Sequence, residues 1–175
     1  MIGWLRFVGL TNAAVWFGAA FFCLLGALPS ASSREMQELL GSNNFPYFSV
    51  AIGQVLQTRY FHWHLVCSAV ALLHLVAEWL YFGKYPQKVA LGLLAALCFI
   101  GLLQACWLQP RLKELHQLQH ARTQQREAAA RAYHVSDGFA EILNVAMLGG
   151  LALYLWRVAN PPDVTRFVTP AKFRS

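Results

Sequence analysis

The sequence has little charge: 13% of its 175 residues are Asp, Glu, Lys or Arg, whereas 57% are hydrophobic. Soluble domains are usually about one-quarter charged, so this composition excludes an ordinary soluble protein. The net charge of +6 would suit nucleic acid, but the basic residues flank long apolar runs, where Lys and Arg normally gather beside a membrane. We therefore expect a lipid bilayer around the chain and no nucleic acid as a partner.

The sequence also lacks the usual motifs of catalysis and metal binding. It contains no nucleophile elbow, no glycine-rich phosphate loop and no H-E-x-x-H helix. Its four cysteines form no C-x-x-C pair, which argues against a zinc site and a disulfide framework. We predict a protein without enzymatic activity and without a resident metal ion.

Four long apolar runs, at about 7–28, 60–82, 86–108 and 135–156, dominate the chain. Each is long enough to cross a ~30 Å hydrocarbon layer as a helix, and none shows the alternation of a membrane β-barrel. The first run is longer than a signal-peptide core, so we expect it to be retained. The pattern predicts an all-α integral membrane four-helix bundle over residues 1–159, a multi-pass protein that we place in a bacterial inner membrane.

The connecting segments carry helix signals of their own. Helix 1 is expected to end before Pro29, and a short helix should follow in "SSREMQELLG", where Ser32 and Glu35 have capping-box spacing and Gly41 suits a helix end. Pro46 fits the first turn of a helix that either continues into the second run or lies at the membrane surface.

Beyond Pro110 the pattern stays helical but becomes polar, which predicts a helical extramembrane extension after helix 3. Its thin apolar stripe should meet a partner subunit or the protein's own loop. Residues 160–175 contain three prolines and should form an extended tail, held by a partner or by the bundle itself. The expected partner contacts are Arg111, Leu112, Leu115, Phe167 and Phe173.

Polar side chains also occur inside the apolar runs. Helix 4 carries polar residues at helical spacing, and helices 1 and 2 add two more; the stripe comprises Asn12, Glu78, Asp137, Glu141 and Asn144. Because ionisable residues in a membrane usually face the bundle interior, we expect the stripes of helices 2 and 4 to face one another. We place Trp63, Cys67 and His74 on the same stripe of helix 2 as Glu78.

Four histidines are candidate cofactor ligands: His62, His64, His74 and His134. Antiparallel threading puts His62, His64 and His134 at one membrane level, where two of them could hold a haem b between facing helices. A lone His74 could hold a chlorophyll. The competing interpretation is that His74 forms a hydrogen bond inside the bundle, with Glu78 one turn away as the obvious partner.

Three stretches, taken in order, resemble a known family. They are "NAAVWFGAAFFCLLGALPS" in helix 1, "WLQPRLKELHQLQHAR" after helix 3 and "YHVSDGFAEILNVAMLGGLAL" in helix 4. The chain resembles the transmembrane protein 205-like family, also described as domain of unknown function 4149. That resemblance implies a small four-helix membrane protein without an established activity, and it gives weight to Pro110, Arg111, His134 and Asn144. It does not extend to the "YFHWH" start of helix 2, to residues 30–58 or to the tail.

Three functions remain open from the sequence. The leading interpretation is a non-catalytic accessory or scaffolding subunit of a larger membrane complex, with other membrane subunits as partners. The alternatives are a haem- or chlorophyll-binding electron-transfer or pigment protein, and a small ion or solute carrier built around Glu141, Asn144 and Asn12. Charge does not decide the membrane orientation, because the basic residues divide evenly between the two sides.

Overall fold

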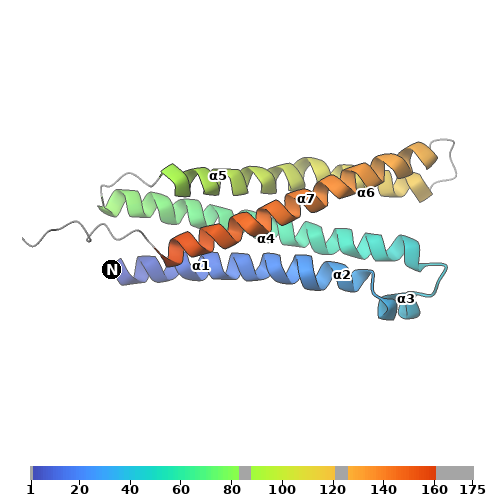
Figure 1. Ribbon diagram of the computed structural model, residues 1–175, viewed down its shortest axis with the longest axis horizontal. Helices are drawn as coiled ribbons and strands as arrows, with labels where there is room; N and C mark the ends of the chain where they lie inside the picture. Colours follow the sequence, from blue (N-terminus) through green and yellow to red (C-terminus); the bar gives the residue numbers. More distant parts are fainter. Residues whose placement is uncertain (1, 83–87, 121–125, 161–175) are drawn as a thin grey trace, which may run out of the picture.

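A computed structural model describes residues 2–82, 88–120 and 126–160, and the regular elements in these ranges are all helical. They are α1 (Ile2–Phe22), α2 (Leu28–Ala31), α3 (Arg34–Leu40), α4 (Phe45–Phe82), α5 (Lys88–Leu103), α6 (Gln109–His120) and α7 (Arg126–Ala159). Two π-helical turns, Cys23–Ala27 and Gln104–Leu108, join α1 to α2 and α5 to α6. The result is four long antiparallel rods with the short α3 at one end (Figure 1), which confirms the all-α bundle.

The four rods have the length and composition of membrane helices. The segments Trp4–Ala31, Phe45–Tyr81, Lys88–His120 and Arg126–Ala159 are each long and apolar enough to cross a membrane. The 38 residues of α4 extend about 57 Å, roughly twice the thickness of a ~30 Å hydrocarbon layer. The first half of α4 therefore continues straight into the second apolar run, and it lies at the same end of the bundle as α3, α6 and the start of α7 (Figure 1). We call this the projecting end, because α4 is longer than the hydrocarbon layer is thick.

Both interrupted rods pass a proline, which corrects the expectation that helix 1 ends before Pro29. A proline has no N–H and its ring clashes with the carbonyl four residues earlier. In each rod the residue before the proline bonds instead to the carbonyl five residues earlier: Leu28 to Cys23, and Gln109 to Gln104. The extra residue of each π-helical turn lets the rod continue past the proline.

The short helix α3 begins one residue later than the capping-box spacing predicts. Ser33 is its N-cap, and its hydroxyl accepts a hydrogen bond from the Met36 N–H at 3.3 Å, whereas the Ser32 hydroxyl donates to the Pro29 carbonyl. Hydrogen bonds from its own backbone N–H and from the Ser33 side chain lower the pKa of Glu35 in the first turn. Gly41, with a φ of 73°, ends the helix as predicted.

The described chain has two apolar cores. The larger lies within the membrane-spanning part and includes Trp16, Phe61, Leu94, Leu97, Met147 and Leu151. The smaller joins the projecting ends of the rods and comprises Leu108, Leu112, Tyr133 and Ala140, with Leu115 packed against it. The apolar stripe of α6 thus packs on the chain's own bundle, which corrects the expectation that Leu112 contacts a partner: only 2% of its surface is exposed. Arg111 is exposed, with its guanidinium 5.5 Å from the centre of the Trp107 ring.

Candidate functional site

His64 on α4 is completely enclosed, and both of its ring nitrogens have partners. Nδ1 accepts a hydrogen bond from Trp16 Nε1 on α1 at 2.9 Å, and Nε2 lies 3.1 Å from the Leu97 carbonyl on α5. Because an indole N–H only donates, Nδ1 is the acceptor and Nε2 carries the proton that is donated to Leu97. His64 is therefore neutral, and it ties three rods together. Tyr154 connects the fourth rod, α7, to this group, because the centre of its ring lies 5.9 Å from the centre of the Trp16 ring.

A glycine makes this enclosure of His64 possible. Gly101 lies one helical turn after Leu97, and a Cβ at this position would overlap the imidazole ring. The ring consequently packs directly against the backbone of α5 and reaches the carbonyl one turn earlier. We call Trp16, His64, Leu97, Gly101 and Tyr154 the Trp16–His64 centre.

His74, three turns further along α4, repeats the same arrangement on α1. Its Nε2 lies 2.8 Å from the Leu5 carbonyl, and a Cβ at Gly9, one turn after Leu5, would overlap its ring. The prediction that His74 forms a hydrogen bond inside the bundle is confirmed. Its partner is the backbone of α1, however, and not the Glu78 side chain.

Amide side chains supply two further links between rods. Gln104, the first residue of the second π-helical turn, donates from Nε2 to Asn144 Oδ1 of α7 at 2.7 Å, and Asn12 donates from Nδ2 to the Cys67 carbonyl at 3.1 Å. Gln104 Oε1 is buried without a hydrogen-bond partner among the described residues. The buried polar side chains of the membrane-spanning part thus serve mainly to connect helices.

The structure separates the histidines that the sequence analysis groups together. His64 faces the bundle interior, whereas His62 and His134 are exposed, so His64 does not belong to an interfacial cluster with them. Trp63, placed on the inward stripe, has 47% of its surface exposed. The spacing of His64, Cys67, Ala71, His74 and Glu78 alternates between three and four residues, as on one face of packed helices. This spacing is the sequence signal that identifies His64 as inward-facing.

A haem or chlorophyll ligand needs a ring nitrogen that can bind the metal. His64 has none to spare, and His74 uses Nε2. His62 binds the Thr58 carbonyl through Nδ1 at 2.8 Å. Cofactor binding stays a prediction, and its remaining candidates are His62, His74 and His134, because His62 and His74 each use one ring nitrogen for a hydrogen bond to a carbonyl. Among the described residues, no group of three or more His, Cys, Asp or Glu side chains could hold a metal ion.

The polar stripe of helix 4 lines a cleft of about 210 Å³ between α7, α4 and the end of the first rod. Asp137, Glu141 and Asn144 all border it, and we call it the acidic cleft. Ser32, Ser49, Gln54, Gln57 and Tyr133 add further polar groups. The stripe therefore faces the start of α4, and not His74 and Glu78 as expected, because the helix 2 stripe is used for contacts with α1.

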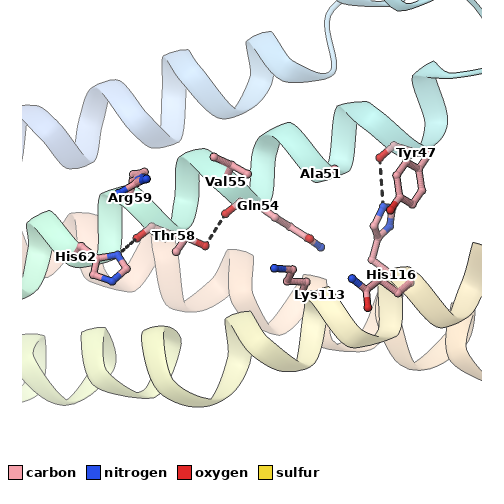
Figure 2. A pocket seen from close by; sticks show the side chains of 10 residues that line it. Tyr47, Ala51, Gln54, Val55, Thr58, Arg59, His62, Lys113 and His116 are labelled. Atoms are coloured by element: carbon pink, nitrogen blue, oxygen red, sulfur yellow. Dashed lines mark hydrogen bonds between the residues drawn. The ribbon is translucent and has the colours of Figure 1, made fainter.

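A second cleft, of about 470 Å³, lies between α4 and α6 (Figure 2). It is lined by Tyr47, Ala51, Gln54, Val55, Thr58, Arg59, His62, Lys113, His116 and Gln117. Two of these residues are permanent cations and none is a carboxylate, so we call it the basic cleft. His116 closes one end, where its Nε2 lies 3.2 Å from the Tyr47 carbonyl. The sequence gives no local signal for this site, since Arg59 and Lys113 are far apart along the chain.

The predicted tail over 160–175, with the expected contacts Phe167 and Phe173, lies beyond the described residues except for Asn160.

Comparison with known proteins gives one match. A search of curated proteins finds no match, and a search of solved structures likewise finds none. Residues 7–121 match the family described as domain of unknown function (DUF4149). The matched range includes the Trp16–His64 pair, Gly101 and all of the basic cleft. The protein is a helical, membrane-type member of the DUF4149 family.

Proposed function

We propose that the protein is a non-catalytic accessory or scaffolding subunit of a larger membrane assembly. The observation that carries this proposal is the use of its buried and half-buried polar side chains. His64, His74, Asn12 and the Gln104–Asn144 pair all bond to a neighbouring helix. Such bonds fix the positions of helices in a bilayer. They stabilise a defined shape, which is what a scaffold needs.

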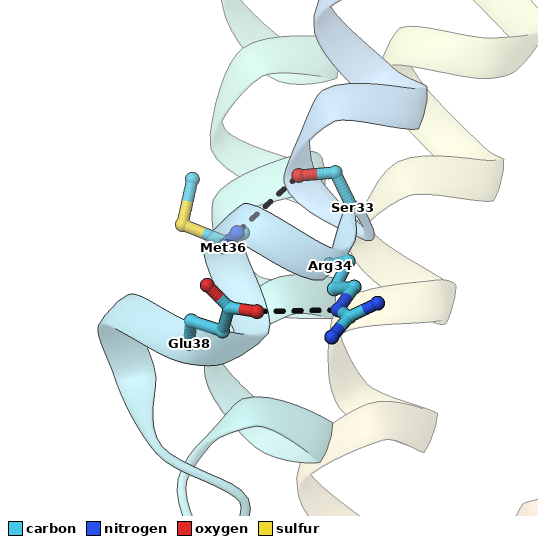
Figure 3. A network of polar contacts seen from close by, with 4 residues as sticks. All are labelled: Ser33, Arg34, Met36 and Glu38. Carbon is cyan, nitrogen blue, oxygen red and sulfur yellow. Dashed lines mark hydrogen bonds and ion pairs between the residues drawn. The ribbon is translucent and has the colours of Figure 1, made fainter.

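The projecting end of the bundle offers a surface for a partner. α3 is held by the Ser33 cap and by an exposed pair between Arg34 and Glu38 at 3.2 Å (Figure 3). It presents Leu39, with 81% of its surface exposed, and nearby on α4 Phe48 is 46% exposed. Phe48 lies about 18 Å along the helix axis from Tyr60, where the second apolar run begins. We propose that these two apolar side chains form part of a contact surface that a neighbouring membrane subunit covers.

Substitutions that introduce negative charges on this surface should weaken the binding of the partner subunit. We expect the wild-type protein, extracted from its own membrane in polymer-bounded lipid discs, to migrate with another subunit in a fixed ratio. The double substitution Leu39→Glu and Phe48→Glu should weaken that association at least about tenfold, as loss of interface anchors does. The measurement is the mass and subunit composition of the discs.

Gln37→Glu together with Asn43→Glu is the matched control, because both residues are exposed in the same part of the chain and the pair adds the same two negative charges. It should leave the assembly intact. Discs that hold only this chain, or an assembly that survives the double substitution, would contradict the proposed scaffold role.

The acidic cleft favours a second candidate function, a small cation carrier. Asp137 and Glu141 lie one helical turn apart on α7, and Asn144 follows Glu141 by almost one more turn. Carboxylate and amide oxygens are the ligands that hard cations prefer. In proteoliposomes, Glu141→Gln should then reduce cation flux about tenfold or more, because the substitution removes one unit of charge from the site. Glu127→Gln, on the same helix but outside the cleft, is the control. Equal flux in all three proteins would eliminate this function.

A further inference from the structure

The basic cleft has the composition of an anion site. Arg59 and Lys113 face it from α4 and α6, and all ten lining residues lack a carboxylate that could neutralise them. In Figure 2 the side chains of Lys113 and Gln54 project into the space between the two helices. Gln54 has partners within the bundle, since its Nε2 lies 3.5 Å from the Leu112 carbonyl and its side chain also forms a hydrogen bond with Tyr133. A guanidinium binds two phosphate oxygens at once, and an ammonium adds a point charge.

The cleft lies at the level of the membrane surface. Trp63 follows Arg59 by one helical turn and is 47% exposed. Trp107, 50% exposed, lies under the guanidinium of Arg111 at the corresponding level of the neighbouring rod. Exposed tryptophans next to basic residues are typical of the headgroup region. An anion bound in the cleft would therefore lie at the same depth as the phosphate groups of the surrounding lipids.

Exposed apolar side chains continue from the cleft into the hydrocarbon layer. On α4, Val66 and Leu73 follow His62 at helical spacing, with 52% and 70% of their surfaces exposed. On α5, Leu102 and Phe99 have 49% and 66% of their surfaces exposed. Exposed apolar side chains next to a cationic cleft suit a ligand with a phosphate and acyl chains, whereas a soluble phosphate would use the cleft alone.

We propose that the basic cleft binds the phosphate of an anionic lipid headgroup, with Arg59 and Lys113 as the charged contacts. The acyl chains lie along the exposed faces of α4 and α5. This site is separate from the partner surface on α3, and it shares Gln54 with the acidic cleft, whose carboxylates lie on α7. Basic pockets between membrane helices bind lipid headgroups by the same electrostatic attraction.

The test uses the purified full-length chain, delipidated in a neutral detergent, with lipid binding followed by native mass spectrometry. Phosphatidylglycerol should bind roughly tenfold more tightly than phosphatidylcholine, as expected for two cations near one net negative charge. The double substitution Arg59→Gln and Lys113→Gln should abolish that difference. Arg126→Gln with Arg131→Gln, which removes two exposed cations from α7, should preserve it.

Two further measurements complete the test. The first asks whether the cleft itself, and not the overall charge of the protein, causes the lipid selectivity. The second asks whether the ligand is a lipid or free phosphate. Val55→Trp keeps both cations but fills the cleft, and it should reduce phosphatidylglycerol binding even if the double variant does not fold. An excess of inorganic phosphate should leave the lipid bound, because phosphate lacks the acyl chains. Selectivity that survives both cleft variants, equal loss in the α7 control, or complete displacement by phosphate would each overturn the assignment.

Discussion

Replacing Gly101 by alanine should lower the free energy of unfolding by about 1–3 kcal/mol, the usual cost of overpacking a filled core. The added methyl group would overlap the His64 ring, and the ring has no free space in which to move, since it is fully buried and held by Trp16 and Leu97. The measurement is a detergent-induced unfolding titration in mixed micelles. Thiol labelling of Cys67, which is buried and free in the folded protein, reports unfolding.

Gly92→Ala on the same helix is the matched control, because a Cβ there meets nothing within 4 Å. It should be neutral, or stabilising by up to about 1 kcal/mol through helix propensity. In a His64→Ala background the cost of Gly101→Ala should disappear, since the overlapping ring is gone. The same comparison applies on α1, with Gly9→Ala against Gly18→Ala. Equal effects of Gly101→Ala and Gly92→Ala would show that His64 does not pack as described.

Replacing Trp16 by alanine should destabilise the bundle by about 3–5 kcal/mol, the range for removing a large buried aromatic side chain. Trp16 has no exposed surface, and it contacts both His64 and Tyr154. The substitution leaves a cavity at the junction of the rods and removes the donor to His64 Nδ1. Thermal unfolding in detergent, followed by the fraction of protein that stays monodisperse, measures the loss.

Two variants separate the causes of this effect. Trp16→Phe keeps most of the ring but removes the N–H, so it should cost less, about 1–3 kcal/mol for an unsatisfied acceptor and the smaller ring. Trp4→Ala, on the same helix, removes a side chain that is 71% exposed and should change the folding free energy little. A loss at Trp4 as large as that at Trp16 would mean that Trp16 is not the packing centre of the bundle.

The long helices were predictable because their signal is local. A continuous apolar run in a bilayer can satisfy its backbone only as a helix or a closed barrel, and the absence of alternation selects the helix. The path past Pro29 was not predictable in this way. Proline favours a helix end by local rules, and continuation through a π-helical turn depends on the contacts that the following residues make with α4.

The site was predictable only in part, for a similar reason. Asp137, Glu141 and Asn144 share a face because they are close in sequence, and they do line one cleft. Trp16 and His64 are 48 residues apart, and neither residue type specifies the other. Leu112 shows the same limit, since an apolar stripe on a polar helix predicts a contact without telling whether the partner is the chain itself.

The sequence by itself determined the class of protein: low charge and four apolar runs require membrane helices, and buried polar side chains require partners because hydrocarbon offers none. Only the tertiary structure decided which groups form hydrogen bonds with these polar side chains. His64 and His74 reach backbone carbonyls because Gly101 and Gly9 leave room on the opposing helices. Arg59 and Lys113 line one cleft because α4 and α6 pack against each other. Distances between helices depend on side-chain volumes at their contacts, and no stretch of sequence read alone contains both sides of such a contact.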